Sequence, residues 1–112
     1  MFFGSSDVPS ITVEELKAKY DARQSFTLVD VREPDEHERC RLPGSKLIPL
    51  GELPQRFGEL RVSDEIIVHC RSGGRSAKAA RFLKEKGFAK VFNLTGGILA
   101  WAERVDPSMP KA

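Results

Sequence analysis

Residues 65–76 read EIIVHCRSGGRS, and this stretch decides the fold. Its first half is an unbroken run of β-branched and apolar residues, which is typical of a strand buried within a parallel sheet. Its second half contains two adjacent glycines and leads into small and apolar residues at helical spacing. That spacing predicts a helix that begins at Ser76 and stops at Gly87. Cys70 therefore stands between the end of a buried strand and the start of a helix.

Strand and helix patterns also alternate along the rest of the chain. Short apolar runs predict three further strands, at residues 26–31, 46–49 and 91–94. Capping residues and helical spacing predict four further helices. The first covers residues 13–21, the second runs from Pro34 to the break at Pro43-Gly44, the third covers residues 53–60, and the fourth follows Thr95-Gly96-Gly97. This alternation predicts an α/β fold, a small parallel sheet with helices on both faces. The functional site of such a sheet lies beyond the carboxyl ends of its strands, where we expect Asp30, Cys70 and residues 95–97.

Length and composition indicate one globular domain over residues 1–112, with loosely ordered ends at 1–9 and 106–112. The chain has 112 residues, of which 40% are hydrophobic and 30% charged, and these proportions exclude disorder and fibrous folds. Its apolar runs are far shorter than the roughly 18 residues of a membrane span. The first residues lack the basic flank and apolar stretch of a signal peptide. We therefore expect a cytoplasmic protein without a membrane partner.

The charges are distributed unevenly, although the net charge is only +2. Residues 70–90 hold seven bases and one acid, whereas acids crowd residues 30–38. A basic segment of this kind attracts small anions. It has no interleaved aromatic platform, so nucleic acid is not an expected partner. The two cysteines are too few for a disulfide framework, which leaves chemistry or packing to explain them.

The loop that follows Cys70 favours a thiolate. Backbone N–H groups converge at the start of a helix, the helix dipole adds positive potential, and Arg71 and Arg75 add more. The pKa of Cys70 is therefore expected below the reference value of about 8.5. The alternative is an inert buried thiol beside a tight turn, but two glycines and two arginines within six residues are more than a turn needs.

Several motifs follow one another in a specific order and spacing. They are Leu28-Val29-Asp30-Val31-Arg32-Glu33, then Leu42-Pro43-Gly44-Ser45, the Cys70 loop, and Gly96-Gly97 followed by Trp101. In these motifs the chain resembles a single-domain rhodanese, a sulfurtransferase. The resemblance implies that Cys70 takes a sulfane sulfur from a small anionic donor such as thiosulfate and becomes a persulfide. The persulfide then passes the sulfur to cyanide, a low-molecular-weight thiol or a protein thiol, with neither cofactor nor metal.

The same resemblance assigns roles to the residues around Cys70. Attack on a sulfur with an anionic leaving group needs a thiolate and positive stabilisation, but no general base. Asp30 is expected to tie down backbone N–H groups near the loop and Arg32 to make a nearby ion pair, the alternatives being an ordinary strand cap and a surface charge. The substrate-binding cradle is the backbone of Arg71, Ser72, Gly73, Gly74 and Arg75, and the supporting residues are Asp30, Arg32 and Ser76.

The chain departs from the family pattern just before Leu42. A Gly-His pair usually precedes that motif, and Cys40-Arg41 stands there instead. We expect Cys40 to lie at the sheet edge opposite Cys70 and to serve packing. His69 is expected in the core, because neighbouring strand residues point to opposite faces. His37 and Cys40 together are too incomplete a ligand set for zinc.

Two other functions stay open. Dual-specificity phosphatases have a related fold, and their loop has five residues between its cysteine and its arginine. In this chain Arg75 is the fifth residue after Cys70, so only four residues lie between them. The shorter loop makes a tighter ring, which suits one sulfur atom better than a phosphoryl group. A non-catalytic interaction module is the other alternative, but such modules commonly lack the cysteine. The loop specifies a small anion and leaves the physiological donor and acceptor open.

Overall fold

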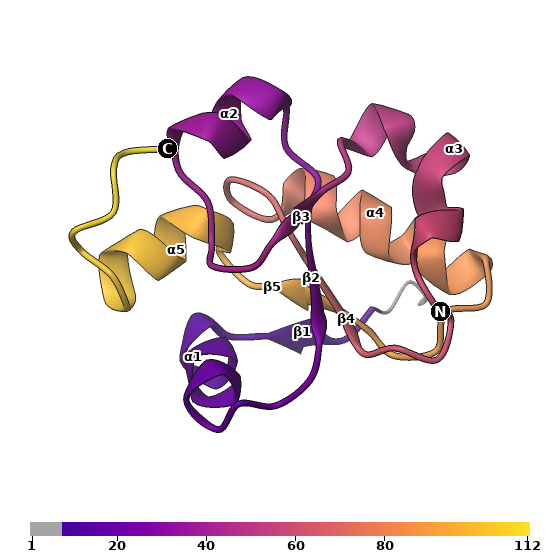
Figure 1. The fold of residues 1–112 in the computed structure, drawn as a ribbon, viewed down its shortest axis with the longest axis horizontal. Coiled ribbons are helices and arrows are strands. Elements are labelled where there is room, and N and C mark those ends of the chain that lie inside the picture. Colours follow the sequence, from indigo (N-terminus) through magenta and orange to yellow (C-terminus); the bar gives the residue numbers. More distant parts are fainter. Residues whose placement is uncertain (1–7) are drawn as a thin grey trace, which may run out of the picture.

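A five-stranded parallel sheet forms the centre of the computed structural model, which describes residues 8–112 (Figure 1). The order across the sheet is β1-β5-β4-β2-β3, and every neighbouring pair is parallel. This confirms the predicted sheet. The strands are β1 (Ser10–Ile11), β2 (Thr27–Asp30), β3 (Lys46–Leu47), β4 (Ile66–His69) and β5 (Val91–Leu94).

The two edge strands differ from the prediction. β3 is shorter than predicted, and β1 is not predicted at all. β1 is not predicted, because two residues are too few to show a pattern. β3 ends at Leu47, although the chain still follows β2 through hydrogen bonds from Ile48 N–H to the Asp30 carbonyl and from Leu50 N–H to the Val31 carbonyl. The intervening residue is a proline, which has no N–H to donate.

Helices cover both faces of the sheet, as predicted. α1 (Val13–Asp21) and α5 (Gly97–Arg104) pack on one face, where Leu16 and Trp101 join the cluster of Leu28 and Ile67. α3 (Leu53–Arg56) and α4 (Gly74–Glu85) pack on the other face. α2 (Pro34–Arg39) lies beyond the carboxyl end of β2 (Figure 1). The predicted capping box of α1 is present, with Thr12 and Glu15 bonded to each other's backbone N–H groups.

The segment predicted as a helix over residues 53–60 is divided into two short pieces, and a third lies just before it. The 3-10 turn η2 (Leu50–Glu52) precedes α3, and the 3-10 turn η3 (Phe57–Glu59) follows it. Glycine is a poor helix former, and Gly58 stands where α3 would have to continue. The helix after Cys70 begins two residues earlier than predicted, at Gly74.

Strand β4 separates the two halves of the core. Val68 and Cys70 belong to the hydrophobic cluster under α4, whereas Ile67 belongs to the cluster under α1 and α5. This alternation follows from the two-residue period of a strand. Cys70 therefore reaches the carboxyl edge of the sheet on the same face as α4.

The two chain ends differ in what the structure describes. Of the loosely ordered stretch expected at residues 1–9, residues 1–7 lie outside the described part of the chain. Near the other end, Met109 and Ala112 pack against the cluster under α1 and α5, and Met109 N–H donates to the Asp106 carbonyl. Within residues 8–112, the helices are all too short or too polar to cross a membrane.

Candidate active site

The loop after β4 turns back over the sulfur of Cys70. Gly73 N–H donates to Sγ at 3.1 Å, Ser76 N–H donates at 3.4 Å, and the Ser76 hydroxyl oxygen lies 3.4 Å from the same atom. The turn requires φ of +122° at Gly73, a conformation that side chains disfavour and glycine tolerates. The side chain of Cys70 is buried, so its sulfur lies within a ring of donors at the start of α4.

Burial and hydrogen bonding have opposite effects on the ionisation of Cys70. Burial opposes the charged thiolate, but hydrogen bonds from Ser76 and from the backbone N–H groups of Gly73 and Ser72 outweigh it. The pKa of Cys70 therefore lies below its ordinary value, the direction that the sequence predicts.

The start of α5 fixes the outer side of this loop. Ile98 N–H donates to the Cys70 carbonyl at 3.0 Å, and Leu99 N–H donates to the Arg71 carbonyl at 3.1 Å. This contact needs a glycine at position 97, where φ is +60° and a Cβ atom would lie 2.4 Å from the Arg71 carbonyl oxygen. The second glycine of the Gly96-Gly97 motif is thus explained by a backbone approach that a side chain would prevent.

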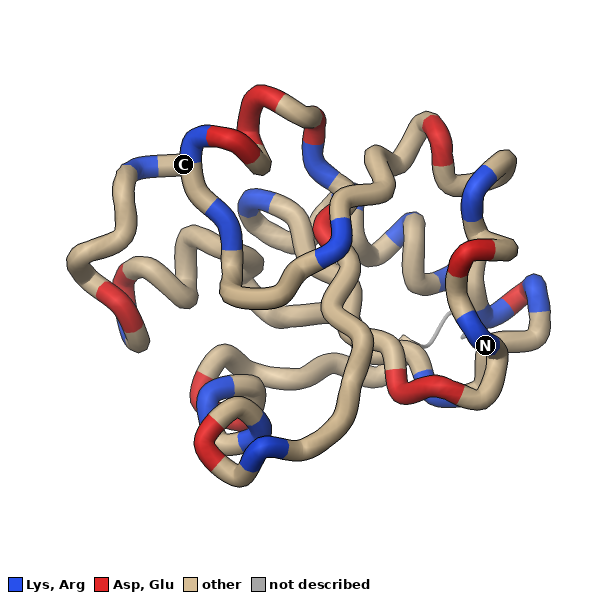
Figure 2. The backbone as a smooth tube through the Cα atoms, viewed as in Figure 1, with Lys and Arg blue, Asp and Glu red and all other residues tan. Residues whose placement is uncertain are grey.

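The two arginines of the loop differ in their surroundings. Arg75 makes a bidentate ion pair with Glu36 of α2, with N–O distances of 2.7 and 3.0 Å. The Arg75 hydrogen bonds outweigh partial burial and lower the pKa of Glu36 to about 2. Arg71 is exposed and makes no ion pair with residues 8–112. The acids that crowd α2 in Figure 2 therefore include the partner of one loop arginine.

Asp30 and Arg32 form a buried ion pair at the carboxyl end of β2. The Asp30 oxygens accept from Arg32 Nε at 2.9 Å and Nη2 at 2.8 Å, and both side chains are 0% exposed. Asp30 also accepts the backbone N–H of Arg32 at 3.0 Å and Nδ1–H of His37 at 2.8 Å. Burial opposes the charge of Asp30, but these hydrogen bonds and the nearby His69 lower its pKa to about 2. The pair thus fastens α2 to the end of β2 instead of contacting the Cys70 loop directly.

Cys40 does not lie at the edge opposite Cys70, so that part of the expectation is wrong. Its carbonyl accepts from Arg32 Nη2 at 2.6 Å, which places its backbone near the carboxyl end of β2. α2 has only six residues and lies beyond the strand end, so the chain has not travelled back along the sheet when it reaches Cys40. The side chain is buried in the cluster under α1 and α5, which agrees with the packing role that we expect.

His69 is buried in the core, as expected. Its side chain is 0% exposed, and burial lowers its pKa to about 4. Nδ1 lies 3.3 Å from the Cys70 carbonyl oxygen. Because neighbouring residues of β4 point to opposite faces, the imidazole lies away from the Cys70 sulfur.

Two neighbours of the loop and one neighbour of Asp30 are not among the predicted site residues. Glu36 is 39 residues from its partner Arg75, and no local pattern reveals such a pair. His37 bonds to Asp30, a contact that its spacing from Cys40 does not suggest. Asn93 could have been recognised from the sequence, because a polar residue within the apolar stretch 91–94 is unusual in a buried strand.

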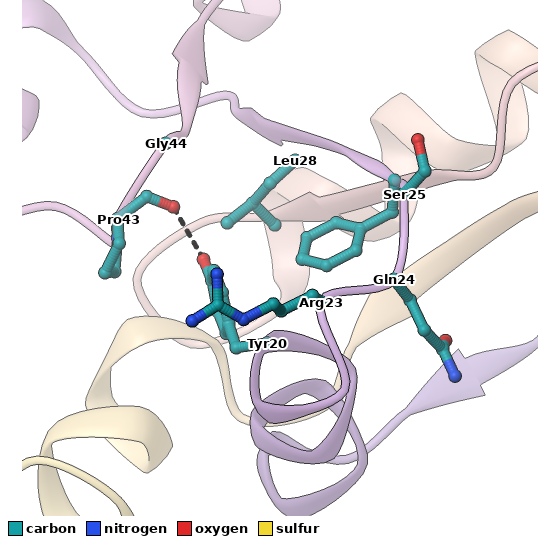
Figure 3. Close-up of a pocket in the computed structure, with 8 residues that line it drawn as sticks. Tyr20, Arg23, Gln24, Ser25, Leu28, Pro43 and Gly44 are labelled. Atoms are coloured by element: carbon teal, nitrogen blue, oxygen red, sulfur yellow. Dashed lines mark hydrogen bonds between the residues drawn. The ribbon is translucent and has the colours of Figure 1, made fainter.

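A separate pocket lies near the amino ends of β2 and β3 (Figure 3). Tyr20 borders it and donates its hydroxyl to the Pro43 carbonyl at 2.7 Å, while its ring meets Phe26 edge to face. Burial raises the pKa of Tyr20 to about 12. These contacts join α1 to the chain before β3. The lining residues are Tyr20, Arg23, Gln24, Ser25, Phe26, Leu28, Pro43 and Gly44, none of which belongs to the Cys70 loop.

Comparison with known proteins agrees with this geometry. The Rhodanese-like domain model matches residues 12–104. A "Sulfurtransferase" of Allochromatium vinosum is 35% identical over 95 residues, which cover 85% of this chain and 89% of that protein. The crystal structure of a rhodanese-like domain protein from Staphylococcus aureus has a TM-score of 0.82 and 30% identity, and covers 94% of this chain and 99% of that one.

A longer relative shares the same domain. YrkF of Bacillus subtilis, whose name proposes a sulfur carrier protein, is 42% identical over 102 residues. The match covers 91% of this chain but 55% of YrkF, so the chain spans about half the length of that relative. With a family match over most of its length, the chain belongs to the rhodanese-like domain family.

Proposed function

We propose that this protein is a sulfurtransferase that carries a sulfane sulfur as a persulfide on Cys70. The observation that supports the proposal most directly is the ring of donors around a buried sulfur, formed by the backbone N–H groups of Gly73 and Ser76 with the Ser76 hydroxyl within hydrogen-bond distance. Such a ring favours a thiolate on Cys70 before the reaction and again after the sulfur has been passed on. Relatives named for sulfur transfer and sulfur carriage agree with this activity.

The first half of the proposed reaction loads the cysteine. With thiosulfate as donor, the Cys70 thiolate attacks the outer sulfur and forms a new S–S bond. The bond between that sulfur and the sulfonate breaks, and sulfite leaves with the electron pair. The cysteine becomes an ionised persulfide, and no external oxidant, reductant or proton is needed. A small persulfide anion would load Cys70 in the same way, with a thiolate as the leaving group.

The loop supports this step through its backbone and through Arg71. The N–H groups of Gly74 and Arg75 stand in the first turn of α4, where helix geometry leaves them without intrahelical partners. We assign them to the outer sulfur and to the oxygens of the departing sulfite. The Arg71 guanidinium is exposed and can attract the donor, whereas Arg75 holds the loop to α2 through Glu36.

The second half of the proposed reaction unloads the sulfur. A thiophilic acceptor such as cyanide, a low-molecular-weight thiol or a protein thiolate attacks the outer sulfur. The S–S bond to Cys70 breaks, and the electron pair returns to Sγ, where the same donors stabilise the leaving thiolate. The negative charge thus moves between Sγ and the outer sulfur, and N–H groups of the same loop face each of the two positions.

The decisive experiment compares two cysteine variants. Cys70→Ser should abolish thiosulfate to cyanide transfer, and Cys40→Ser should keep most of it, because only Cys70 lies within the ring of donors. Mass spectrometry after incubation with thiosulfate should find one added sulfur on the Cys70 peptide, removable by dithiothreitol. Equal loss of activity in both variants would contradict the single-cysteine mechanism.

The same samples distinguish the two rival functions. Hydrolysis of p-nitrophenyl phosphate faster than consumption of thiosulfate would favour a phosphatase. A protein that neither gains sulfur on Cys70 nor transfers it from any of several anionic donors would be an interaction module. Rapid loading from a persulfide but not from thiosulfate would keep the sulfurtransferase and change its donor.

A further inference from the structure

Asn93 of β5 reaches the catalytic loop through its side-chain amide. Its Oδ1 atom lies 2.6 Å from the Ser76 hydroxyl oxygen, and its Nδ2 atom lies 3.4 Å from the Gly73 carbonyl oxygen. The Ser76 hydroxyl oxygen is in turn 3.4 Å from the Cys70 sulfur. A single hydroxyl group therefore links the amide to the reacting sulfur.

The orientation of the amide follows from its two neighbours. The Gly73 carbonyl can only accept a hydrogen bond, so the amide nitrogen must face it, and the amide oxygen must then face Ser76. The opposite orientation would place two oxygens against each other at Gly73. Asn93 Oδ1 is thus an acceptor for the Ser76 hydroxyl.

The Ser76 hydroxyl has one proton and several acceptors around it. Asn93 Oδ1 is the nearest at 2.6 Å, the Gly73 carbonyl oxygen is at 3.2 Å and the Cys70 sulfur is at 3.4 Å. A single O–H group cannot donate fully to all three. A proton bonded to Asn93 leaves only oxygen lone pairs for Cys70, which can accept from a thiol but cannot stabilise a thiolate.

We propose that Asn93 is a positioning residue that competes with the Cys70 thiolate for the proton of the Ser76 hydroxyl. When the negative charge is on Sγ, the hydroxyl rotates toward the sulfur. When Cys70 is a neutral thiol or carries the charge on an outer sulfur, the hydroxyl returns to Asn93. No bond is made or broken in this movement, and the hydroxyl follows the charge as the sulfur is loaded and unloaded.

The proposal rests on the proposed function for its role in the cycle, but its test does not. The test measures the pKa of Cys70 from the ultraviolet absorbance of its thiolate during a pH titration, without any sulfur donor. All variants carry Cys40→Ser, so that Cys70 is the only cysteine observed. The surrounding charged and titratable groups stay unchanged, namely Asp30, Arg32, Glu36, His37, His69, Arg71 and Arg75.

Asn93→Leu removes the competing acceptor at similar volume. It should lower the pKa of Cys70 by about one pH unit, the size of one hydrogen bond to a charged group. Asn93→Asp keeps an acceptor, makes it stronger and should raise the pKa. In a Ser76→Ala background the effect of Asn93→Leu should vanish, and any remaining effect of Asn93→Asp measures direct repulsion between the two charges.

A purely structural role for Asn93 gives the opposite result. If the amide only held the loop through the Gly73 carbonyl, Asn93→Leu would loosen the ring of donors and raise the pKa of Cys70, with or without Ser76. A rise in both backgrounds, or no change in either, overturns the proposal, and Asn93→Asp supplies the comparison if the leucine variant does not fold. Should the titrations agree with the proposal while wild-type protein transfers no sulfur, the proposed function alone fails.

Discussion

The buried pair of Asp30 and Arg32 gives a prediction whose size follows from the structure. Asp30→Asn would leave the Arg32 guanidinium, which is 0% exposed, without its counter-charge. Removing one partner of a buried ion pair costs about 3–5 kcal/mol, a large share of the roughly 5–15 kcal/mol that stabilises a domain. The matched control is Asp21→Asn, which breaks an exposed pair with Lys17 and should cost about 0.5 kcal/mol or less.

The pH dependence of stability provides a second measure of the same pair. The pKa of Asp30 falls from 3.8 to about 2 in the folded protein, because its hydrogen bonds outweigh burial. Since the folded value is the lower one, the pair stabilises the protein fully above about pH 5 and loses this contribution as the pH falls toward about 2. The change corresponds to about 2 kcal/mol of unfolding free energy.

Urea titrations followed by Trp101 fluorescence, at several pH values between neutral and about 2, test both statements. A double variant, Asp30→Asn with Arg32→Met, removes both charges and leaves the other carboxylates in place. Wild type should lose about 2 kcal/mol more than this variant over the acid range. A constant difference between them across that range, or an Asp30→Asn cost no larger than that of Asp21→Asn, would refute the reasoning.

Four other perturbations test the loop. Gly97→Ala should lower the free energy of unfolding by about 2 kcal/mol or more in a urea titration. The reason is that its Cβ atom would lie 2.4 Å from the Arg71 carbonyl oxygen. The control is Gly51→Ala, which should leave the free energy of unfolding unchanged because the space around Gly51 is open. Arg71→Ala should raise the KM for thiosulfate about tenfold through a lost charge contact. Glu36→Gln should mainly lower kcat, because it releases the loop from α2. Steady-state kinetics that show the same KM change for both variants would contradict these separate roles of Arg71 and Glu36. Insertion of one glycine between residues 73 and 74 should sharply reduce sulfur transfer and permit weak hydrolysis of p-nitrophenyl phosphate, and an insertion variant with undiminished transfer would contradict the argument from ring size.

The sequence predicts the sheet and the position of Cys70 because both depend on short-range patterns. An unbroken apolar strand followed by a glycine loop and a helical repeat lies within residues 65–87. The lowered pKa of Cys70 follows from the same local arrangement, since its hydrogen-bond donors lie within six residues of it. These features need no knowledge of how distant segments pack.

The contacts that hold the loop in place could not be predicted in this way. The sequence predicts that Arg75 adds positive potential at the loop, but it does not reveal the partner Glu36, which comes from a helix 39 residues earlier. The position of Cys40 is misjudged because a helix is expected to run back along the sheet, and α2 is too short to do so. Both cases depend on where a six-residue helix lies, which sequence periodicity does not determine.

The close approach at Gly97 determines how two peptide planes are turned. In a trans peptide the carbonyl and the following N–H point in opposite directions. Because α5 binds the carbonyls of Cys70 and Arg71 on the outside of the loop, the N–H groups of Arg71 and Ser72 must face inward, where the Ser72 N–H helps to lower the pKa of Cys70. A helix that holds no reacting group thus sets the sign of the charge that the loop accepts. A side chain at position 97 would free these planes to rotate, and a loop with its carbonyls turned inward would repel the anion that it now attracts.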